Sequence, residues 1–166
     1  MTWSITTEPA VSATATALWR EYYTEVSDRW YLRFEGHRTD PAELEREIAA
    51  QTWAELTPPT GRLLVARYGG EPAGTAGVHL LDAHTAELRR VYVRPAHRGK
   101  GGAELLVRAA EDAARAICAA HIVLDTRSDL TEARALYTRL GYTETERHND
   151  EPYAEHWFRK ELTPVS

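Results

Sequence analysis

Apolar residues near the start of the chain recur at the spacing of an amphipathic helix. This spacing predicts a first helix over residues 8–26. Its periodic positions are Ala15, Leu18, Trp19, Tyr22 and Tyr23. Asp40 has the properties of an N-cap and Pro41 those of a first helical residue, so a second short helix is predicted up to Ala50. The aromatic segment 29–34 between the two helices is ambiguous from its pattern alone.

Apolar runs in the middle of the chain predict three β-strands. The first two cover residues 63–68 and 73–81, and the pair Gly69-Gly70 between them is typical of a tight hairpin turn. The third covers residues 86–93 and stops before Pro95. A β-hairpin followed by a further strand is therefore expected.

Helices and strands alternate in the second half of the chain. Residues 101–117 have a clear amphipathic helical pattern. The outer face of this helix carries two i,i+4 pairs of opposite charge, Glu104 with Arg108 and Glu111 with Arg115.

The remaining segments complete a mixed α/β pattern. Residues 122–124 form a short apolar run of the kind buried in a parallel sheet. Asp129 is predicted to cap a helix that ends at residues 140–141. Two last strands are predicted over residues 142–148 and 155–162. This order, without repeats or linkers, predicts one α/β domain over the whole chain, residues 1–166.

Composition narrows the class of protein. The chain has 166 residues, of which 43% are hydrophobic, enough for a single core. Cys118 is the only cysteine, and the first part of the chain lacks the apolar run of an export signal, so a cytoplasmic protein without disulfides is expected. No stretch approaches the roughly 20 apolar residues that span a bilayer. The formal net charge of -5 argues against nucleic acid as a partner.

A glycine-rich turn follows the third predicted strand and leads into the helix at 101–117. Glycines allow the backbone to approach a ligand closely, and the free N–H groups of a helix's first turn favour phosphate. Arg98 and Lys100 add positive charge. The glycine spacing matches neither the P-loop of nucleotide-binding proteins nor the dinucleotide fingerprint. Another kind of anion site is therefore predicted; the alternative is a surface turn that only joins strand to helix.

This turn resembles the pyrophosphate loop of the GNAT superfamily of acetyltransferases. Arg98, Gly101 and Ala103 occupy the positions of the family pattern Q/R-x-x-G-x-G/A. The resemblance implies that backbone amides of the loop hold the pyrophosphate of acetyl-CoA, and that the preceding strand pairs with its pantetheine arm. The implied cofactor-binding residues are Val91, Tyr92, Val93, Arg98, Gly99, Lys100, Gly101, Gly102, Ala103 and Tyr137. Gly102 departs from the family, which more often has Ile or Val there.

A second segment, about thirty residues further on, resembles the same family. Ala133, Leu136, Tyr137 and Gly141 fit the pattern A-x-x-L-Y-x-x-x-G-F/Y. Leu130 stands where the family often has asparagine, which implies that one polar contact with the cofactor is missing. Together the two matches imply a mixed, mostly antiparallel sheet of six or seven strands, flanked by about four helices, with a splayed parallel strand pair.

Acetyl transfer to an amine needs a base for the amine and an acid for the departing thiolate. Glu87 lies at a strand position where many members of the family carry the base; the alternative is a strand-end carboxylate paired with Arg89. A carboxylate with a pKa of about 4 cannot efficiently deprotonate an ammonium of about 10, so Glu87 is expected to act through water or on the pKa of the amine. Tyr137 is the family's usual acid, and the alternative is an aromatic residue packed on the sheet. A main-chain N–H of residues 91–93 is expected to stabilise the oxyanion.

Other reactive side chains suggest no separate centre. The histidines lack the spacing of metal ligands, so no metal is expected, and Cys118 is expected to be a small buried hydrophobe. A group of aromatic residues in the first helix and the segment after it fits core packing, but the resemblance implies that these residues also line the site for the amine. They are Trp19, Tyr22, Tyr23, Trp30 and Tyr31. Nearby acidic residues either steer a cation or are solvated: Glu21, Glu25 and Asp28.

The sequence thus predicts an N-acetyltransferase that moves an acetyl group from acetyl-CoA to a primary amine of a small molecule, directly and within a ternary complex. Two alternatives are a module that binds acyl-CoA without turnover and an enzyme that acetylates a protein lysine or N-terminus. The presence of both Glu87 and Tyr137 favours catalysis. The resemblance also suggests a homodimer in which strands within residues 142–162 pair between subunits.

Overall fold

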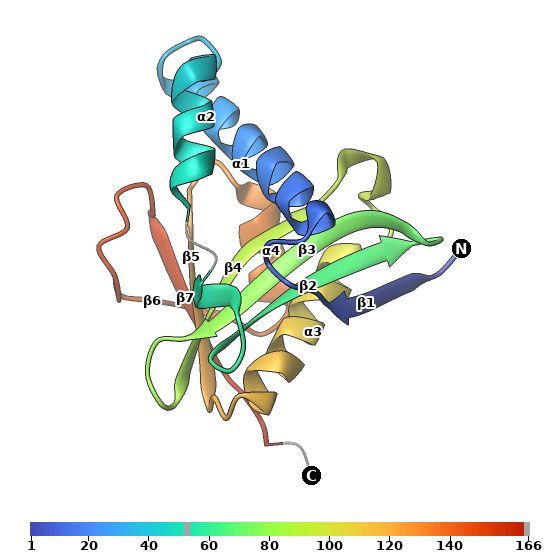
Figure 1. Cartoon of the computed structure of the whole chain (residues 1–166). Coiled ribbons are helices and arrows are strands. Elements are labelled where there is room, and N and C mark those ends of the chain that lie inside the picture. The colour runs from blue at the N-terminus through green and yellow to red at the C-terminus, as the bar shows by residue number, and fades with distance from the viewer. Residues whose placement is uncertain (52–53, 165–166) are drawn as a thin grey trace.

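A seven-stranded sheet forms the centre of the protein, with helices on both of its faces (Figure 1). The computed structural model describes residues 1–51 and 54–164. Within them the strand order is β1-β2-β3-β4-β5-β7-β6, and every neighbouring pair is antiparallel except β4 and β5. The strands are β1 (Trp3–Thr7), β2 (Gly61–Tyr68), β3 (Glu71–Leu80), β4 (Thr85–Val93), β5 (His121–Thr126), β6 (Thr143–Thr145) and β7 (His156–Glu161). The helices are α1 (Ala13–Phe34), α2 (Pro41–Ala50), α3 (Gly102–Ala116) and α4 (Thr131–Arg139), with short 3-10 helices η1 (Ala54–Leu56) and η2 (Pro95–His97). The predicted mixed, mostly antiparallel architecture is confirmed.

Successive residues of the central strands pack against different helices. On β2, Leu64 belongs to the core under α3, which contains Leu106, whereas Val65 packs with Leu18 of α1. Leu136 of α4 belongs to the same core as Leu106, so α3 and α4 cover one face of the sheet and α1 covers the other. Each fully buried side chain of this size stabilises the fold by about 1.5–3 kcal/mol. Because successive side chains of a strand point to opposite faces, both faces of the sheet pack against helices.

Helix α1 begins later and ends later than predicted. It starts after Ser12, whose hydroxyl accepts a hydrogen bond from the N–H of Ala15 at 3.0 Å. Glu8 lies outside the helix, and its carboxylate accepts a hydrogen bond from the Ser12 hydroxyl at 2.5 Å. The ambiguous segment 29–34 is the end of this helix, and Gly36, with φ of 77°, follows it.

Two predicted roles of acidic residues were wrong because these carboxylates have other partners. Asp129 does not cap α4, whose cap position is one residue later; it accepts two hydrogen bonds from Arg127 at 3.0 Å each. Glu111 does not pair with Arg115. It is buried and receives the ammonium of Lys160 at 3.1 Å, a partner from β7 that is distant in sequence.

One strand was missed, and two further local predictions need correction. Strand β1 was not predicted; it is a short edge strand that pairs with β2, and its Trp3 and Ile5 pack against the core under α3. Strand β6 is shorter than the predicted 142–148. Cys118 is exposed, with φ of 72°, in the turn after α3.

The parallel strands β4 and β5 separate partway along their length. Their pairing ends at Glu87 opposite Val123, although β4 continues to Val93. On its other edge, β4 carries one residue more than the part of β3 that it faces, a bulge that contains Arg90 with φ of 58°. Within the described part of the chain, the pairing between β4 and β5 therefore does not extend over residues 88–93. This is the splay that the family resemblance implied.

Candidate active site

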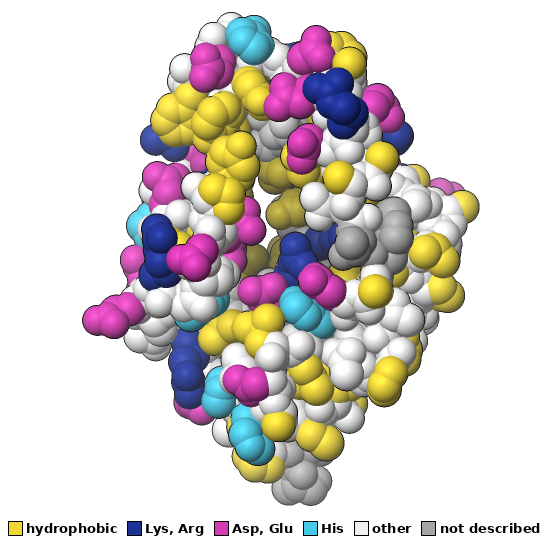
Figure 2. All heavy atoms as spheres, turned by 60° about the vertical axis from the view of Figure 1, so that its left-hand side comes forward, with side chains coloured by type: hydrophobic (Ala, Val, Ile, Leu, Met, Phe, Trp, Pro, Cys, Tyr) yellow, Lys and Arg dark blue, Asp and Glu magenta, His cyan; other side chains and the backbone are white. Residues whose placement is uncertain are grey.

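A cleft of about 1160 Å³ opens where β4 and β5 separate. Figure 2 shows it as a hollow with arginine and carboxylate side chains on its lower wall and hydrophobic side chains along its upper rim. Its lining comes from α1, α4, the central strands, the turn before α3 and the segment that precedes β7. The volume exceeds the range of about 300–1,000 Å³ that is usual for one small ligand. The cleft therefore has room for two ligands side by side.

The glycine turn before α3 has the geometry of an anion site. Gly99 and Gly101 have φ of 77° and 81°, values that residues with a side chain rarely adopt. The first hydrogen bond within α3 comes from the N–H of Leu105, which donates to the Gly101 carbonyl at 3.3 Å. The N–H groups just before Leu105 therefore have no acceptor within the helix, and their residues line the cleft. Together with the helix dipole, they suit a phosphate group.

The two cationic residues of the turn have protein partners. The guanidinium of Arg98 donates to the Val93 carbonyl at 2.8 Å and to both carboxylate oxygens of Glu25 at 2.8 Å. Arg98 thus ties the turn to the end of β4 and to α1. The ammonium of Lys100 lies 4.6 Å from the ring centroid of Tyr68, and Lys100 does not line the cleft.

The end of β4 presents main-chain groups to the cleft. Val91, Tyr92 and Val93 all line it, and they lie beyond the point where β5 has diverged. The edge of these residues that would face β5 borders the gap between the strands, and the Val93 carbonyl accepts the hydrogen bond from Arg98. An extended ligand with amide groups can pair with such an edge as a strand does.

Tyr137, predicted as the acid, lies on α4 at the wall of the cleft. Its ring is buried and packs 5.7 Å from the ring of Tyr142 and 6.2 Å from that of Phe158. Burial raises the pKa of Tyr137 well above its ordinary value, so the phenol keeps its proton at neutral pH. Tyr137 therefore packs in the core and also borders the cleft, and its role as the acid stays a prediction.

Glu87, predicted as the base, lies on β4 at the last residue pair before the splay. Its carboxylate accepts a hydrogen bond from Nε2 of His79 at 3.0 Å, and the Nε of Arg89 lies 3.6 Å away. Arg89 donates its hydrogen bond to the carboxylate of Glu55, which is therefore its principal partner. Burial raises the pKa of Glu87, but the His79 hydrogen bond and the charges of Arg89 and His79 outweigh it, so the pKa lies below its usual range. Glu87 is therefore ionised at neutral pH.

Sequence reasoning missed Asp125, at the end of β5. Asp125 accepts a hydrogen bond from the Asn149 amide at 2.7 Å, and that amide is held by the indole of Trp157 at 2.9 Å. Burial, together with the nearby charge of Glu87, raises the pKa of Asp125 above its usual range. An acidic residue directly after the apolar run 122–124 was a readable signal, but its partner Asn149 comes from a distant loop.

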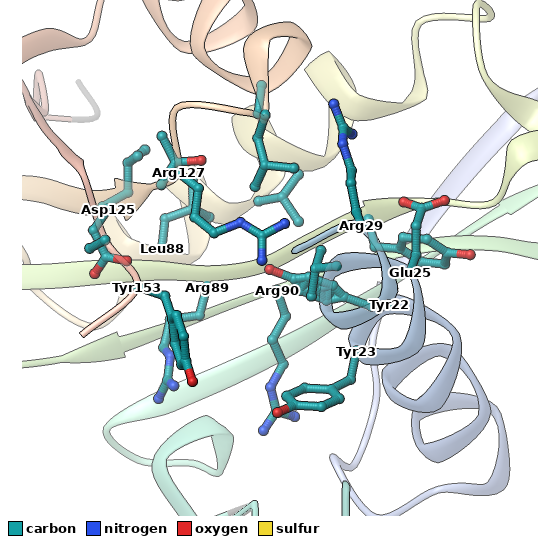
Figure 3. A pocket seen from close by; sticks show the side chains of 18 of the residues that line it. Tyr22, Tyr23, Glu25, Arg29, Leu88, Arg89, Arg90, Asp125, Arg127 and Tyr153 are labelled. Atoms are coloured by element: carbon teal, nitrogen blue, oxygen red, sulfur yellow. The ribbon is translucent and has the colours of Figure 1, made fainter. Parts of the chain in front are cut away.

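Aromatic side chains form the wall opposite Asp125. Figure 3 shows Tyr22 and Tyr23 on α1 across the cleft from Asp125 and Tyr153, with Arg89 and Arg90 between them. All of the aromatic residues singled out in the sequence line the cleft: Trp19, Tyr22, Tyr23, Trp30 and Tyr31. The Arg90 guanidinium lies 3.9 Å from the centre of the Trp19 ring, and burial lowers its pKa to about 10. Trp30 and Tyr153, with ring centroids 5.6 Å apart, join α1 to the segment before β7.

The acidic residues predicted to steer a cation are engaged within the protein. Glu21 pairs with Arg94 at 2.7 Å, Glu25 pairs with Arg98, and Asp28 accepts a hydrogen bond from the N–H of Thr39. They therefore anchor α1.

The structure describes residues 1–51 and 54–164 of the chain. No group of three or more His, Cys, Asp or Glu side chains there is arranged to hold a metal ion. None of the helices in that part of the chain combines the length and apolar character that crossing a membrane requires.

Comparison with known proteins gives consistent matches. A model of the Acetyltransferase (GNAT) family matches residues 14–142. The uncharacterized N-acetyltransferase YjgM of Escherichia coli is 38% identical over 81 residues, which are 47% of this chain and 48% of that protein. The chain spans between 26% and 60% of the length of the curated relatives it matches.

Solved structures share the fold. A GNAT-family acetyltransferase from Staphylococcus aureus has a TM-score of 0.74 at 14% identity and covers 98% of this chain and 100% of its own. A GNAT-family acetyltransferase from Elizabethkingia anophelis, with acetyl-CoA bound, has a TM-score of 0.63 at 17% identity, with 96% and 98% covered. At these identities the likeness concerns the fold alone.

Proposed function

Because the chain belongs to the GNAT family of acetyltransferases, we propose that it moves the acetyl group of acetyl-CoA to a primary amine of a small molecule, directly and within a ternary complex. One observation carries this proposal. The glycine turn before α3, the end of β4 beyond the splay, Tyr137 and Glu87 all border the same cleft. Separate patches would not allow a direct transfer between two bound ligands.

The described residues fit acetyl-CoA at two places. The N–H groups at the start of α3 suit its pyrophosphate, and the edge of residues 91–93, beyond the point where β5 diverges, suits the amides of its pantetheine arm. When bound there, acetyl-CoA supplies an acetyl group activated as a thioester. A main-chain N–H of residues 91–93 would then be available to stabilise negative charge on the acetyl oxygen.

Two side chains are proposed to handle protons. Tyr137 is protonated at neutral pH, as any phenol with a pKa of about 10 or higher is, and it would give that proton to the departing thiolate. Glu87, held ionised by His79, is a weak base, so it would orient the amine and pass its proton to ordered water. Cys118 is exposed on the turn after α3 and is not among the residues that line the cleft, so a direct transfer is favoured over a covalent acyl-enzyme.

The acceptor half of the cleft favours a cationic or aromatic amine. Tyr22 and Tyr23 face it from α1, and aromatic faces attract cations. Asp125 and Glu151 border the same space, and burial together with neighbouring carboxylates raises the pKa of both. A positively charged ligand would relieve this mutual repulsion.

Thiol release tests the proposal. The protein is mixed with acetyl-CoA and a panel of primary amines, including aromatic amines, diamines, amino acids and a lysine peptide, and free CoA is followed with a thiol reagent. Release that depends on a small amine supports the proposal. CoA binding without release from any amine would favour the acyl-CoA-binding module, and release with the lysine peptide alone would favour a protein acceptor.

A further inference from the structure

The first strand of the protein contacts the glycine turn that leads into α3. Trp3, on β1, donates a hydrogen bond from its indole Nε1 to the carbonyl oxygen of Lys100 at 2.9 Å, across 97 positions in the sequence. Neither Trp3 nor Lys100 lines the cleft, whereas Gly99 and Gly101 on either side of Lys100 do. The Lys100 carbonyl is therefore held on the side of the turn that faces away from the cleft. A carbonyl oxygen directed into the cleft would instead repel a phosphate group.

Trp3 also explains why residue 102 is a glycine. A Cβ at Gly102 would lie 2.4 Å from Cη2 and 2.5 Å from Cζ2 of Trp3, closer than such atoms approach in proteins. The φ of Gly102 is not in the left-handed region, so the backbone conformation itself does not require glycine. The indole thus occupies the space in which a side chain at position 102 would lie.

The indole is held in place by neighbouring rings. Its centroid lies 5.0 Å from that of Tyr68 on β2 and 6.4 Å from that of His97 in η2. Tyr68 also carries the Lys100 ammonium over its face. The turn is therefore attached to the edge of the sheet through Trp3, independently of the Arg98 contacts to β4 and α1.

We propose that Trp3 is a positioning residue for the co-substrate: it fills the place of a side chain at 102 and holds the Lys100 carbonyl away from the cleft, which keeps the N–H groups of the turn directed at a pyrophosphate. The proposal rests on the proposed function, because it takes CoA as the ligand of the turn. It assigns a role in binding affinity to β1, a short edge strand that contributes no residue to the lining of the cleft.

Binding of CoA, measured by isothermal titration calorimetry, tests this assignment. Trp3→Phe keeps a ring but loses the indole N–H, and CoA should bind roughly 3- to 10-fold more weakly, the usual effect of one hydrogen bond. At saturating acetyl-CoA, kcat should stay within about 2-fold, because Trp3 does not touch the cleft. Trp157→Phe is the matched control, since it removes another indole hydrogen bond, to Asn149, away from the turn. CoA affinity should not change in that variant.

A double substitution separates this role from general stability. Gly102→Ala alone should weaken CoA binding by about 10-fold or more, because the new methyl group collides with Trp3. In a Trp3→Ala background the space is open, so the same Gly102→Ala change should weaken binding by less than about 2-fold. The rescue would show that the Trp3 ring and a side chain at 102 compete for one place, and weaker CoA binding in Trp3→Ala alone, with unchanged thermal unfolding, would show that the ring positions the turn.

The outcomes distinguish two failures. If the unaltered protein binds CoA and the Trp3 variants bind it equally well, or if the effects of Trp3→Ala and Gly102→Ala simply add, the assignment of Trp3 is wrong while the proposed function stands. If the unaltered protein does not bind CoA, both are overturned. Thermal unfolding of each variant without ligand checks that a loss of affinity is not a loss of folded protein.

Discussion

The cleft has two halves that are built in different ways. The half proposed for the co-substrate is nearly continuous in sequence, from Val91 to Ala103, and presents mainly backbone N–H and C=O groups. The half proposed for the acceptor is made of side chains from α1, β3, β4, β5 and the segment before β7. A backbone site depends on local conformation, so a short run of residues can specify it. A side-chain site depends on which distant segments meet, and its chemistry can change without altering the turn.

Tyr137 lies between the two halves of the cleft, and Tyr137→Phe should have the largest effect on activity. Loss of the phenolic proton should lower kcat by about 10- to 1000-fold, the usual range for a general acid, whereas CoA affinity should stay nearly unchanged. Steady-state kinetics with a saturating amine, together with calorimetry for CoA, measure the two quantities. Full kcat in this variant would reduce Tyr137 to its packing role against Tyr142 and Phe158.

Arg98→Ala should affect the co-substrate half alone. Because the Arg98 side chain ties the turn to Val93 and Glu25, its loss should weaken the binding of CoA by about 1–3 kcal/mol, which is roughly 5- to 150-fold in Kd. Arg108→Ala, on the exposed face of α3, is the matched control and should bind CoA normally. Unchanged CoA affinity in Arg98→Ala would show that the backbone of the turn suffices.

Glu87→Gln should change the pH dependence of the reaction. Its pKa lies below the usual range, so the carboxylate is ionised across neutral pH and can assist loss of the amine proton there. Without it, deprotonation depends on the amine itself, so the rising limb of kcat/KM should move to higher pH, with roughly 10- to 100-fold lower activity at pH 7. In Tyr137→Phe the limb should stay in place. A limb that does not move in Glu87→Gln would leave this residue as a structural partner of His79 and Arg89.

Asp125→Asn should give a small gain in stability together with a loss of acceptor binding. Burial raises the pKa of Asp125, so the folded protein holds this proton more tightly than the unfolded chain does. The ionised carboxylate therefore lowers stability above its ordinary pKa of about 4, and the asparagine variant should melt roughly 1–3 °C higher at pH 7. The difference should vanish as the pH falls below about 4. A rise in the KM of a cationic amine, with CoA affinity unchanged, would assign Asp125 to the acceptor half.

Much of the fold could be predicted from the sequence because its signals are local. The hairpin at Gly69-Gly70, the amphipathic α3 and the strand β5 follow from turn residues and from periodicity. Strand β1 was missed since five residues at a sheet edge give little periodicity, and its pairing with β2 joins positions about sixty residues apart. Glu111 was misassigned for a similar reason, because its partner Lys160 comes from the other end of the chain.

The candidate site shows the same difference between residues with local sequence signals and residues whose partners are distant in sequence. Residues 91–93 and 98–103, Glu87 and Tyr137 were named from motifs. The structure places all of them on one cleft except Lys100, whose ammonium lies against Tyr68. The partner that holds Glu87 ionised, His79, was passed over because its significance depends on β3 pairing with β4 in the observed register. Asp125 was missed because its neighbour Asn149 lies in a loop without a motif.

The splay of β4 from β5 means that the sheet is completed by what binds to it. Amide hydrogens on the open edge of residues 88–93 should exchange with deuterated solvent faster than those of the paired residues 85–87, and should be protected when CoA is added. If CoA fills the gap, its binding also raises the free energy of unfolding, by about 2.7 kcal/mol at a CoA concentration 100 times the Kd. The lifetime of the folded protein in a cell would then follow the supply of its own co-substrate.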